Sequence, residues 1–276
     1  MISLDTGSFI LILLRRVRLR DGRLVDAREM DIGIRKVEVK SDGFYVNDEK
    51  IYLQGFSRHE CFPILGKAVK GAVLRRELDT LKRMGANIFR TSHYPHCRET
   101  YELADRLGLM VIDEFCFLGG NAEREGQEKV RQRGKQMLEE LIRRDRNHPS
   151  VVIWSVGDEP ANRIPEVAEF VRQLMDHART LDPTRPVMFC GCDFDWAGDP
   201  DKKGEAIIED LAVGDSDIMD IHNYPGWYDN FGQLDVGVEK FSKIIDLLYR
   251  KHRKPIMVGE FGAGAISGLH SDPPEM

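Results

Sequence analysis

The residues VVIWSVGDEP at positions 151–160 form an apolar run that ends in two acids and a proline. A continuous apolar run of this length is typical of a strand buried on both faces, as in a parallel sheet. Pro160 has no N–H with which to continue a strand ladder, so we expect the chain to leave the sheet there. Asp158 and Glu159 would then stand where a buried strand ends.

Similar apolar runs recur along the chain, and most are followed by a charged segment with helical periodicity. We predict strands at 52–56, 86–90, 110–113, 151–156, 187–190, 218–222 and 256–259. Between them we predict helices at 71–84, 99–107, 128–146, 164–181, 205–212 and 238–252. Alternation of strand and helix indicates an α/β fold with a parallel sheet covered by helices. Before this part, the runs 9–20 and 32–39 predict a β-rich preface.

Two architectures fit the alternation. A doubly wound open sheet usually carries a glycine-rich phosphate loop after an early strand, and no G-x-G-x-x-G stands in that place. A (β/α)8 TIM-type barrel gathers polar residues at its strand ends, and this chain has them there, so the sequence favours the barrel. Because only seven strands can be found before Met276, we expect a fragment whose barrel lacks its last βα unit.

Composition excludes several classes of function. The 276 residues are 42% hydrophobic and 31% charged, as in soluble globular proteins. With 40 Lys and Arg against 46 Asp and Glu, the net charge is −6, which leaves no bulk positive field for nucleic acid. The apolar run 9–14 is too short to span a bilayer and lacks the preceding positive charge of a secretory signal. Together with an odd set of five cysteines, which suits reduced thiols, this predicts a cytoplasmic protein without a membrane partner.

Two strand-end acids carry the predicted chemistry. Glu159 ends one apolar strand, and Glu260 ends another about a hundred residues later. Each could cap a helix or pair with an arginine, but two acids facing one cavity are what glycosidic bond cleavage needs. Carboxyl groups ~5–5.5 Å apart would retain the anomeric configuration, and a gap of ~6.5–9.5 Å would invert it. The sequence leaves both mechanisms open.

Four motifs in order resemble the catalytic barrel of glycoside hydrolase family 2: GFSRHE at 55–60, FRTSHYP at 89–95, NHPS at 147–150 leading into WSVGDEP at 154–160, and GEFG at 259–262. Within the family, FPILG at 62–66, YPGWY at 224–228 and GLHS at 268–271 are most similar to β-glucuronidases. The resemblance covers roughly residue 25 to the end. It implies that 1–42 is the β-rich remnant of an immunoglobulin-like sandwich domain and that 43–276 is the glycosidase barrel, incomplete at its C-terminus.

The resemblance also implies retaining hydrolysis of terminal β-D-glucuronides, with Glu159 as general acid/base and Glu260 as nucleophile. The acid/base role requires a carboxyl that holds its proton near neutral pH. Cationic Arg90 beside Glu260 would keep the nucleophile ionised. The remaining motif positions imply hydrogen bonds from Arg90 and Tyr224 to the nucleophile, a sugar subsite lined by His59 and His93, and Trp227 and Tyr228 near the glycone or aglycone.

The chain departs from the family pattern in two places. Asp158 stands where the family has an Asn that contacts the sugar 2-hydroxyl, so we expect a shifted acid limb of the pH profile. The segment that holds the sugar carboxylate in β-glucuronidases lies largely beyond the last residue. We therefore expect the chain alone to be weakly active or inactive and to associate with itself, since an incomplete barrel exposes strand edges.

Other functions remain open from the sequence. The chain could hydrolyse β-galactosides or other β-glycosides, or it could be a non-catalytic sugar-binding or interaction remnant. Cys190-x-Cys192 and His93-x-x-His96 do not make a four-ligand zinc set, and the resemblance implies no metal and no cofactor.

Overall fold

The structure, a computed structural model, describes residues 11–69, 71–117, 128–192, 194–196, 206–228 and 230–264. The predicted motif at 268–271 and the start of the first predicted β-run lie outside these residues. In the described part of the chain, no helix combines the length and the apolar character that crossing a bilayer requires.

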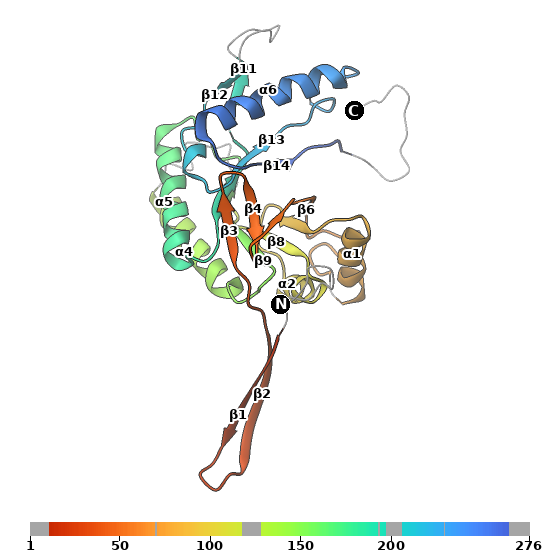
Figure 1. Cartoon of the computed structure of the whole chain (residues 1–276), viewed down its shortest axis with the longest axis vertical. Coiled ribbons are helices and arrows are strands. Elements are labelled where there is room, and N and C mark those ends of the chain that lie inside the picture. Colours follow the sequence, from red (N-terminus) through yellow and green to blue (C-terminus); the bar gives the residue numbers. More distant parts are fainter. Residues whose placement is uncertain are drawn as a thin grey trace.

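A parallel sheet forms the centre of the molecule (Figure 1). Five strands lie side by side in chain order: β6 Gly55–Arg58, β7 Ile88–Thr91, β8 Met110–Glu114, β9 Val151–Asp158 and β10 Val187–Cys190. Two more, β13 Met219–His222 and β14 Ile256–Glu260, pair in parallel with each other. Backbone hydrogen bonds from Asp217 N to Val187 O (2.9 Å) and from Cys192 N to Asp220 O (3.0 Å) link β10 to β13. The predicted α/β fold with a parallel sheet is confirmed.

Helices cover the outer face of this sheet (Figure 1). They are α1 Ala72–Arg83, α2 Arg98–Leu107, α4 Glu128–Asp145, α5 Pro165–Leu181 and α6 Leu234–His252. Pro165 occupies the first turn of α5, where its missing N–H costs nothing, and Gly108 ends α2 in the left-handed conformation. One apolar cluster fills the space between helices and sheet, and it includes Trp154 and Phe170.

A second apolar cluster fills the inner face of the sheet and is closed at one end by a small antiparallel sheet. That sheet comprises β3 Val37–Lys40, β4 Gly43–Val46 and β5 Glu49–Ile51. Phe44 and Val46 are buried against side chains of the parallel strands. Arg35 donates to Pro149 O and Val151 O, at the start of β9. The small sheet therefore lies at the amino ends of the parallel strands and leaves their carboxyl ends accessible.

The strands β1 Leu11–Arg18 and β2 Leu24–Ile32 form an antiparallel hairpin that projects from the body (Figure 1). The division into domains at residue 42 stays a prediction. The predicted boundary runs between β3 and β4, which pair with each other.

Three predicted elements differ from the structure. The helix at 205–212 is wrong, because β12 Ala206–Ile208 pairs antiparallel with β11 Phe194–Trp196, and a short 3-10 helix, η2 Val213–Asp215, follows. Isoleucines at 207 and 208 favour a strand once a partner strand is present. The β-run predicted at 32–39 is interrupted, because the chain leaves the strand conformation between the end of β2 and the start of β3, where Arg35 donates to Val151 O on β9. The strand predicted at 52–56 is displaced, since β6 begins at Gly55.

Candidate active site

The described polar side chains of this site stand at the carboxyl ends of the parallel strands. Arg90 lies on β7, Glu114 ends β8, Asp158 ends β9, His222 ends β13 and Glu260 ends β14. Because parallel strands point the same way, their carboxyl ends meet at one edge of the sheet. Residues up to 170 positions apart in sequence are thereby brought into contact.

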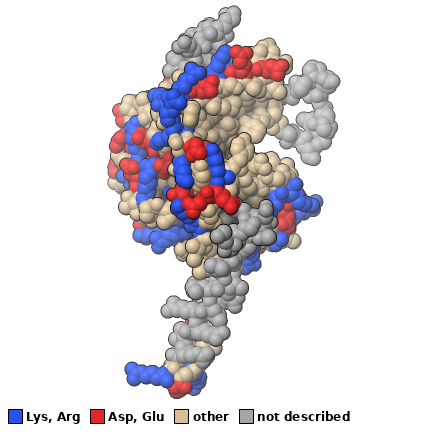
Figure 2. Space-filling view, viewed as in Figure 1, with Lys and Arg blue, Asp and Glu red and all other residues tan. Residues whose placement is uncertain are grey.

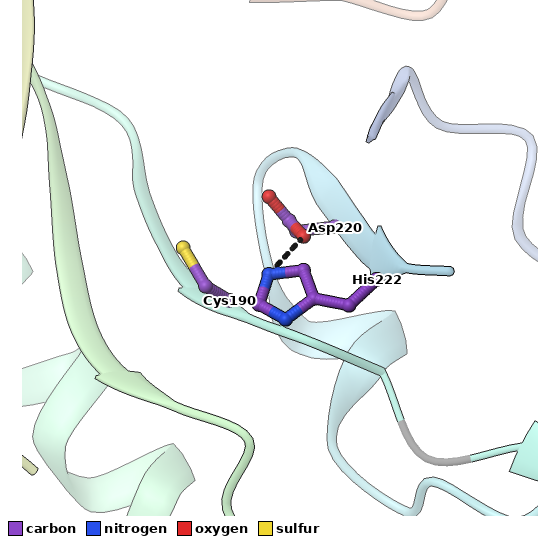
Figure 3. Close-up of side chains that lie close together, drawn as sticks. All are labelled: Cys190, Asp220 and His222. Carbon is purple, nitrogen blue, oxygen red and sulfur yellow. Dashed lines mark ion pairs between the residues drawn. The ribbon is translucent and has the colours of Figure 1, made fainter. Parts of the chain in front are cut away.

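Glu159 directly follows β9 and bends the chain away from the sheet. Its φ of 43° lies in the left-handed region, which is rare for a residue with a side chain. The side chain is 61% exposed, and its Oε1 lies 3.0 Å from Nδ1 of His222. Figure 3 shows His222 backed by Asp220, whose Oδ1 lies 3.3 Å from Nε2 of the ring. One carboxylate oxygen of Glu159 and one of Glu260 lie within 4.8 Å of each other.

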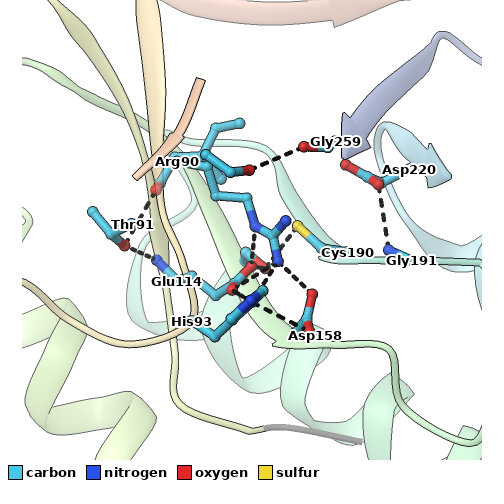
Figure 4. A network of polar contacts seen from close by, with 12 residues as sticks. Arg90, Thr91, His93, Glu114, Asp158, Cys190, Gly191, Asp220 and Gly259 are labelled. Carbon is cyan, nitrogen blue, oxygen red and sulfur yellow. Dashed lines mark hydrogen bonds and ion pairs between the residues drawn. The ribbon is translucent and has the colours of Figure 1, made fainter. Parts of the chain in front are cut away.

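Arg90 is the centre of the polar network in Figure 4. Its guanidinium is 2% exposed and binds Glu114 through two hydrogen bonds, of 2.7 and 2.9 Å. It also donates to Glu260 Oε1 at 2.7 Å and to Asp158 Oδ1. Burial disfavours the cation, but the acidic groups around it, first Cys190 and then Glu114 and Asp158, outweigh burial and hold the pKa of Arg90 above its ordinary value. One buried cation thus holds three carboxylates.

Glu260 is surrounded by groups that favour its ionised form. Tyr224 donates its hydroxyl proton to Oε2 at 2.6 Å, and Arg90 binds the other oxygen. Burial on its own would raise the pKa of Glu260, but the charge of His222, the Tyr224 hydrogen bond and the charge of Arg90 lower it overall, against the opposing charge of Asp158. The carboxylate is therefore an anion near neutral pH, as a nucleophile must be.

Both predicted histidines lie beside this network. His93 Nδ1 stands 3.2 Å from Asp158 Oδ2 and 3.3 Å from Glu114 Oε1. Burial disfavours its charged ring, but these hydrogen bonds prevail and raise the pKa of His93 to about 9. The ring of His59 packs edge-on against His93, with centroids 5.1 Å apart. Burial and the charge of His93 lower the pKa of His59, so the two rings carry different charges near neutral pH.

The predicted aromatic residues form the outer part of the site. The ring of Tyr228 packs edge-on against Tyr224, with centroids 5.1 Å apart, and it is 70% exposed. Trp227 lies next to Tyr228, at 6.4 Å between ring centroids, and packs closely over Gly264. The structure therefore brings all nine predicted site residues to one end of the sheet. His59, His93 and the aromatic residues surround the carboxylate network there.

Three further residues of the network were missed as site residues by sequence reasoning. Glu114 is fully buried and, although burial disfavours its charge, Arg90 and His93 keep its pKa below the usual value. His222 touches both predicted catalytic glutamates, at 3.0 Å from Glu159 and 3.6 Å from Glu260. Asp220 lies behind His222. Glu114 and His222 end their strands, which marked them as possible site residues. The local sequence does not show which of several adjacent polar residues points into the site.

Cys190, Asp220 and His222 place one potential ligand atom each within 4.8 Å of the others. These side chains already take part in polar contacts. Asp220 pairs with His222, and the Cys190 sulfur contacts Ser155 Oγ at 3.4 Å. Burial raises the pKa of the Cys190 thiol well above its ordinary value, so the sulfur is held as a thiol rather than as the thiolate that metals prefer. We assign this group to the hydrogen-bond network and not to a metal.

A cavity of about 320 Å³ opens beside Glu159 and His222. Its other lining residues include Gly191, Cys192 and Phe194. Another cavity, of about 490 Å³, is lined mainly by 35–39 and 183–186 and contains none of the predicted site residues. The candidate acid/base therefore faces an open hollow on the side away from the amino ends of the strands.

Comparisons with known proteins agree with this geometry. The family model for the glycosyl hydrolases family 2 TIM barrel domain matches residues 37–276. Mouse (Mus musculus) β-glucuronidase is 37% identical over 254 residues, which are 92% of this chain and 37% of that protein. The solved β-D-glucuronidase of Dictyoglomus thermophilum is 35% identical, with a TM-score of 0.83, over 97% of this chain and 45% of that one.

The β-glucuronidase of Bifidobacterium dentium, solved with coumarin-3-O-glucuronide, is 29% identical, with a TM-score of 0.86, over 98% of this chain and 42% of that one. The chain thus spans about two-fifths of the length of these relatives. Since the family model covers most of the sequence, the chain belongs to glycosyl hydrolase family 2, as a β-glucuronidase-like domain.

Proposed function

We propose that this chain carries the catalytic machinery for hydrolysis of terminal β-D-glucuronides with retention of the anomeric configuration. The observation that carries the proposal is the approach of the Glu159 and Glu260 carboxylates, from different strands, to within 4.8 Å between oxygens. That approach favours direct attack by one carboxylate over a mechanism that needs a water between the two groups.

In the first step, Glu260 attacks the anomeric carbon while Glu159 donates a proton to the departing glycosidic oxygen. Glu260 suits the nucleophile role because Arg90 and Tyr224 orient it and keep it ionised. Glu159 suits the acid role because its side chain is the exposed one of the pair and borders the open cavity. The products of this step are a glycosyl ester on Glu260 and the free aglycone.

In the second step, Glu159 takes a proton from water, and the resulting hydroxide attacks the same carbon and releases Glu260. His59, His93 and the carboxylate of Asp158 are proposed to contact the sugar hydroxyls. Tyr228 and Trp227 are proposed to flank the sugar at the rim. Glucuronide as the substrate is supported by the relatives, which are named β-glucuronidases, and by the glucuronide in the Bifidobacterium dentium structure.

We also propose that the parallel sheet is most of an eight-stranded barrel. The support is a hydrogen bond between its two outer strands, from Ser57 Oγ on β6 to Gly259 O on β14 at 3.1 Å. This contact supports a sheet in which β6 and β14 curve towards each other.

A panel of p-nitrophenyl β-D-glycosides tests the function. We expect release of p-nitrophenol from the glucuronide above that from the galactoside and mannoside, and no turnover by Glu260→Gln. Nuclear magnetic resonance of the first-formed sugar should show the β-anomer. Faster hydrolysis of the galactoside would reassign the substrate. Binding of glucuronide without turnover, unchanged in Glu260→Gln, would instead favour a sugar-binding remnant.

A further inference from the structure

Glu159 is held by a single side chain among the described residues. Its carboxylate Oε1 lies 3.0 Å from His222 Nδ1, while the rest of the side chain is largely exposed. A general acid must present its proton at a defined position, so whatever orients this carboxylate affects proton transfer directly. His222 is in the position to do so.

His222 is itself rigidly placed. Its side chain is 5% exposed, and its other nitrogen lies 3.3 Å from Oδ1 of the fully buried Asp220 (Figure 3). The same Asp220 oxygen accepts the backbone N–H of Gly191 at 3.3 Å. Asp220 Oδ2 lies against Gly259 and has no hydrogen-bond partner. The carboxylate therefore contacts His222 and Gly191 through Oδ1. A buried carboxylate thus orients a histidine, which orients an exposed glutamate.

Gly191 makes room for the contact. Its φ of 78° is in the left-handed region, and a Cβ there would lie 2.7 Å from Glu159 Cγ and 3.1 Å from His222 Nδ1. The contact between Glu159 and His222 therefore leaves no room for a side chain at position 191.

The charges around His222 come from every neighbouring strand. The groups that face it are Asp220 on β13, Asp158 and Glu159 from β9 (3.9 and 3.0 Å), Glu260 on β14 (3.6 Å), Arg90 on β7 (3.3 Å) and the Cys190 thiol on β10. Burial disfavours the charged ring, but the carboxylates outweigh it and raise the pKa of His222 to about 10. The ring is therefore a cation near neutral pH, and both nitrogens donate.

We propose that His222, anchored by Asp220, is the positioning residue of the acid/base Glu159. It donates to Oε1, which leaves Oε2 to carry the proton towards the glycosidic oxygen. When the bond from the anomeric carbon to that oxygen breaks, the proton moves from Oε2 to the oxygen, and Glu260 forms the new bond to carbon. His222 keeps its own proton and stabilises the carboxylate left on Glu159. This inference rests on the proposed function.

Two substrates distinguish a positioning role of His222 from a general effect of its substitution on the stability of the protein. A p-nitrophenolate group departs with little help from an acid, whereas the methoxide of methyl β-D-glucuronide needs the proton. His222→Phe keeps the ring but removes the donor, so we expect kcat for the methyl glucuronide to fall at least about tenfold more than for the p-nitrophenyl glucuronide. His222→Asn retains an N–H near the Nδ1 position and should restore most of that ratio. Equal losses on both substrates would overturn the proposal.

The matched control is His148→Asn. His148 also pairs with a carboxylate, through Nδ1 to Asp105 at 2.6 Å, but near the amino end of β9. It should leave the substrate ratio unchanged. If the wild type hydrolyses neither glucuronide, the proposed function fails.

The pairing of His222 with Glu159 can then still be tested by nitrogen NMR of the His222 ring. The titration midpoint of this ring should fall in Glu159→Gln, because the hydrogen bond to Glu159 raises the pKa of His222. An unchanged midpoint would overturn the pairing.

Discussion

At the scale of single residues, the main feature of the site is that the Arg90 cation contacts several carboxylates. Arg90 contacts Glu114, Asp158 and Glu260 and is almost fully buried. A buried arginine with this many partners is costly to lose, because each carboxylate would be left without compensation. Two milder changes test the assigned roles: one removes the hydroxyl that donates to Glu260, and the other removes the charge of Asp158.

Tyr224→Phe removes the hydroxyl that donates to Glu260. Hydrogen bonds to charged groups contribute ~1.5–3 kcal/mol, so kcat/KM for a glucuronide should fall by about 10- to 100-fold. The Tyr224 hydrogen bond also lowers the pKa of Glu260, so its loss should raise that pKa and move the acid limb to higher pH. A pH–rate series measures both effects. Tyr249→Phe on the surface of α6 is the control and should change neither.

Asp158→Asn tests the acid that stands in place of the family's Asn. The charge of Asp158 raises the pKa of Glu260, and its contact with His93 raises the pKa of that ring. Without the charge, the pKa of Glu260 should fall, and the acid limb of kcat/KM should move to lower pH. Superimposable profiles of wild type and variant would show that Asp158 has no such effect.

At the scale of the element, β8 directs two consecutive acids to opposite faces of the sheet. Glu114 points to the site, whereas Asp113 points outward and accepts the Tyr101 hydroxyl of α2 at 2.7 Å. Asp113 is fully buried, and its second oxygen has no hydrogen-bond partner. Burial, together with the nearby charge of Asp145, raises the pKa of Asp113 well above its ordinary 3.8.

This raised pKa makes stability depend on pH. The contribution of Asp113 is fully present below its unfolded pKa and is lost as the pH rises through its folded value. Asp113→Asn should therefore reduce the loss of unfolding free energy between about pH 5 and about pH 8. Urea unfolding at the two pH values measures the change. Asp176→Asn, an exposed acid on α5, should leave it as in the wild type.

At the scale of the whole molecule, the two outer strands of the parallel sheet are its least covered part. β9 is buried along its length, whereas every residue of β14 is only partly buried. Phe56 on β6 and Phe261 after β14 are 42% and 70% exposed. In the space-filling view, the surface between α6 and the part that carries β6 and α1 is largely uncharged (Figure 2). Partly covered apolar strands are sites of self-association.

We therefore expect the chain on its own to associate as its concentration rises, with weak turnover. Light scattering after size exclusion measures the mass. Phe56→Lys should reduce the association, because it places a charge on the exposed strand, whereas Ile34→Lys, at an exposed apolar residue away from β6, should not. A monodisperse monomer with full turnover would contradict both parts of the expectation.

The sequence alone was sufficient for most of the alternation of strands and helices and for placing Glu159 and Glu260 at the ends of two strands. Apolar runs, helix periodicity and the acids that end a run are local, so they are visible within one segment of chain. The helix predicted at 205–212 failed because β12 takes its conformation from pairing with β11, which no local pattern reports.

Tertiary structure alone decided which strand-end side chains meet. Arg90 reaches Glu260 across 170 residues and His222 across 132, and these contacts depend on how far the sheet curves. Whether Asp113 or Glu114 faces the site depends on the phase of the strand, and a shift by one residue exchanges the two faces. For the same reason His222, which touches both glutamates, was visible in the sequence only as one more polar residue after a strand.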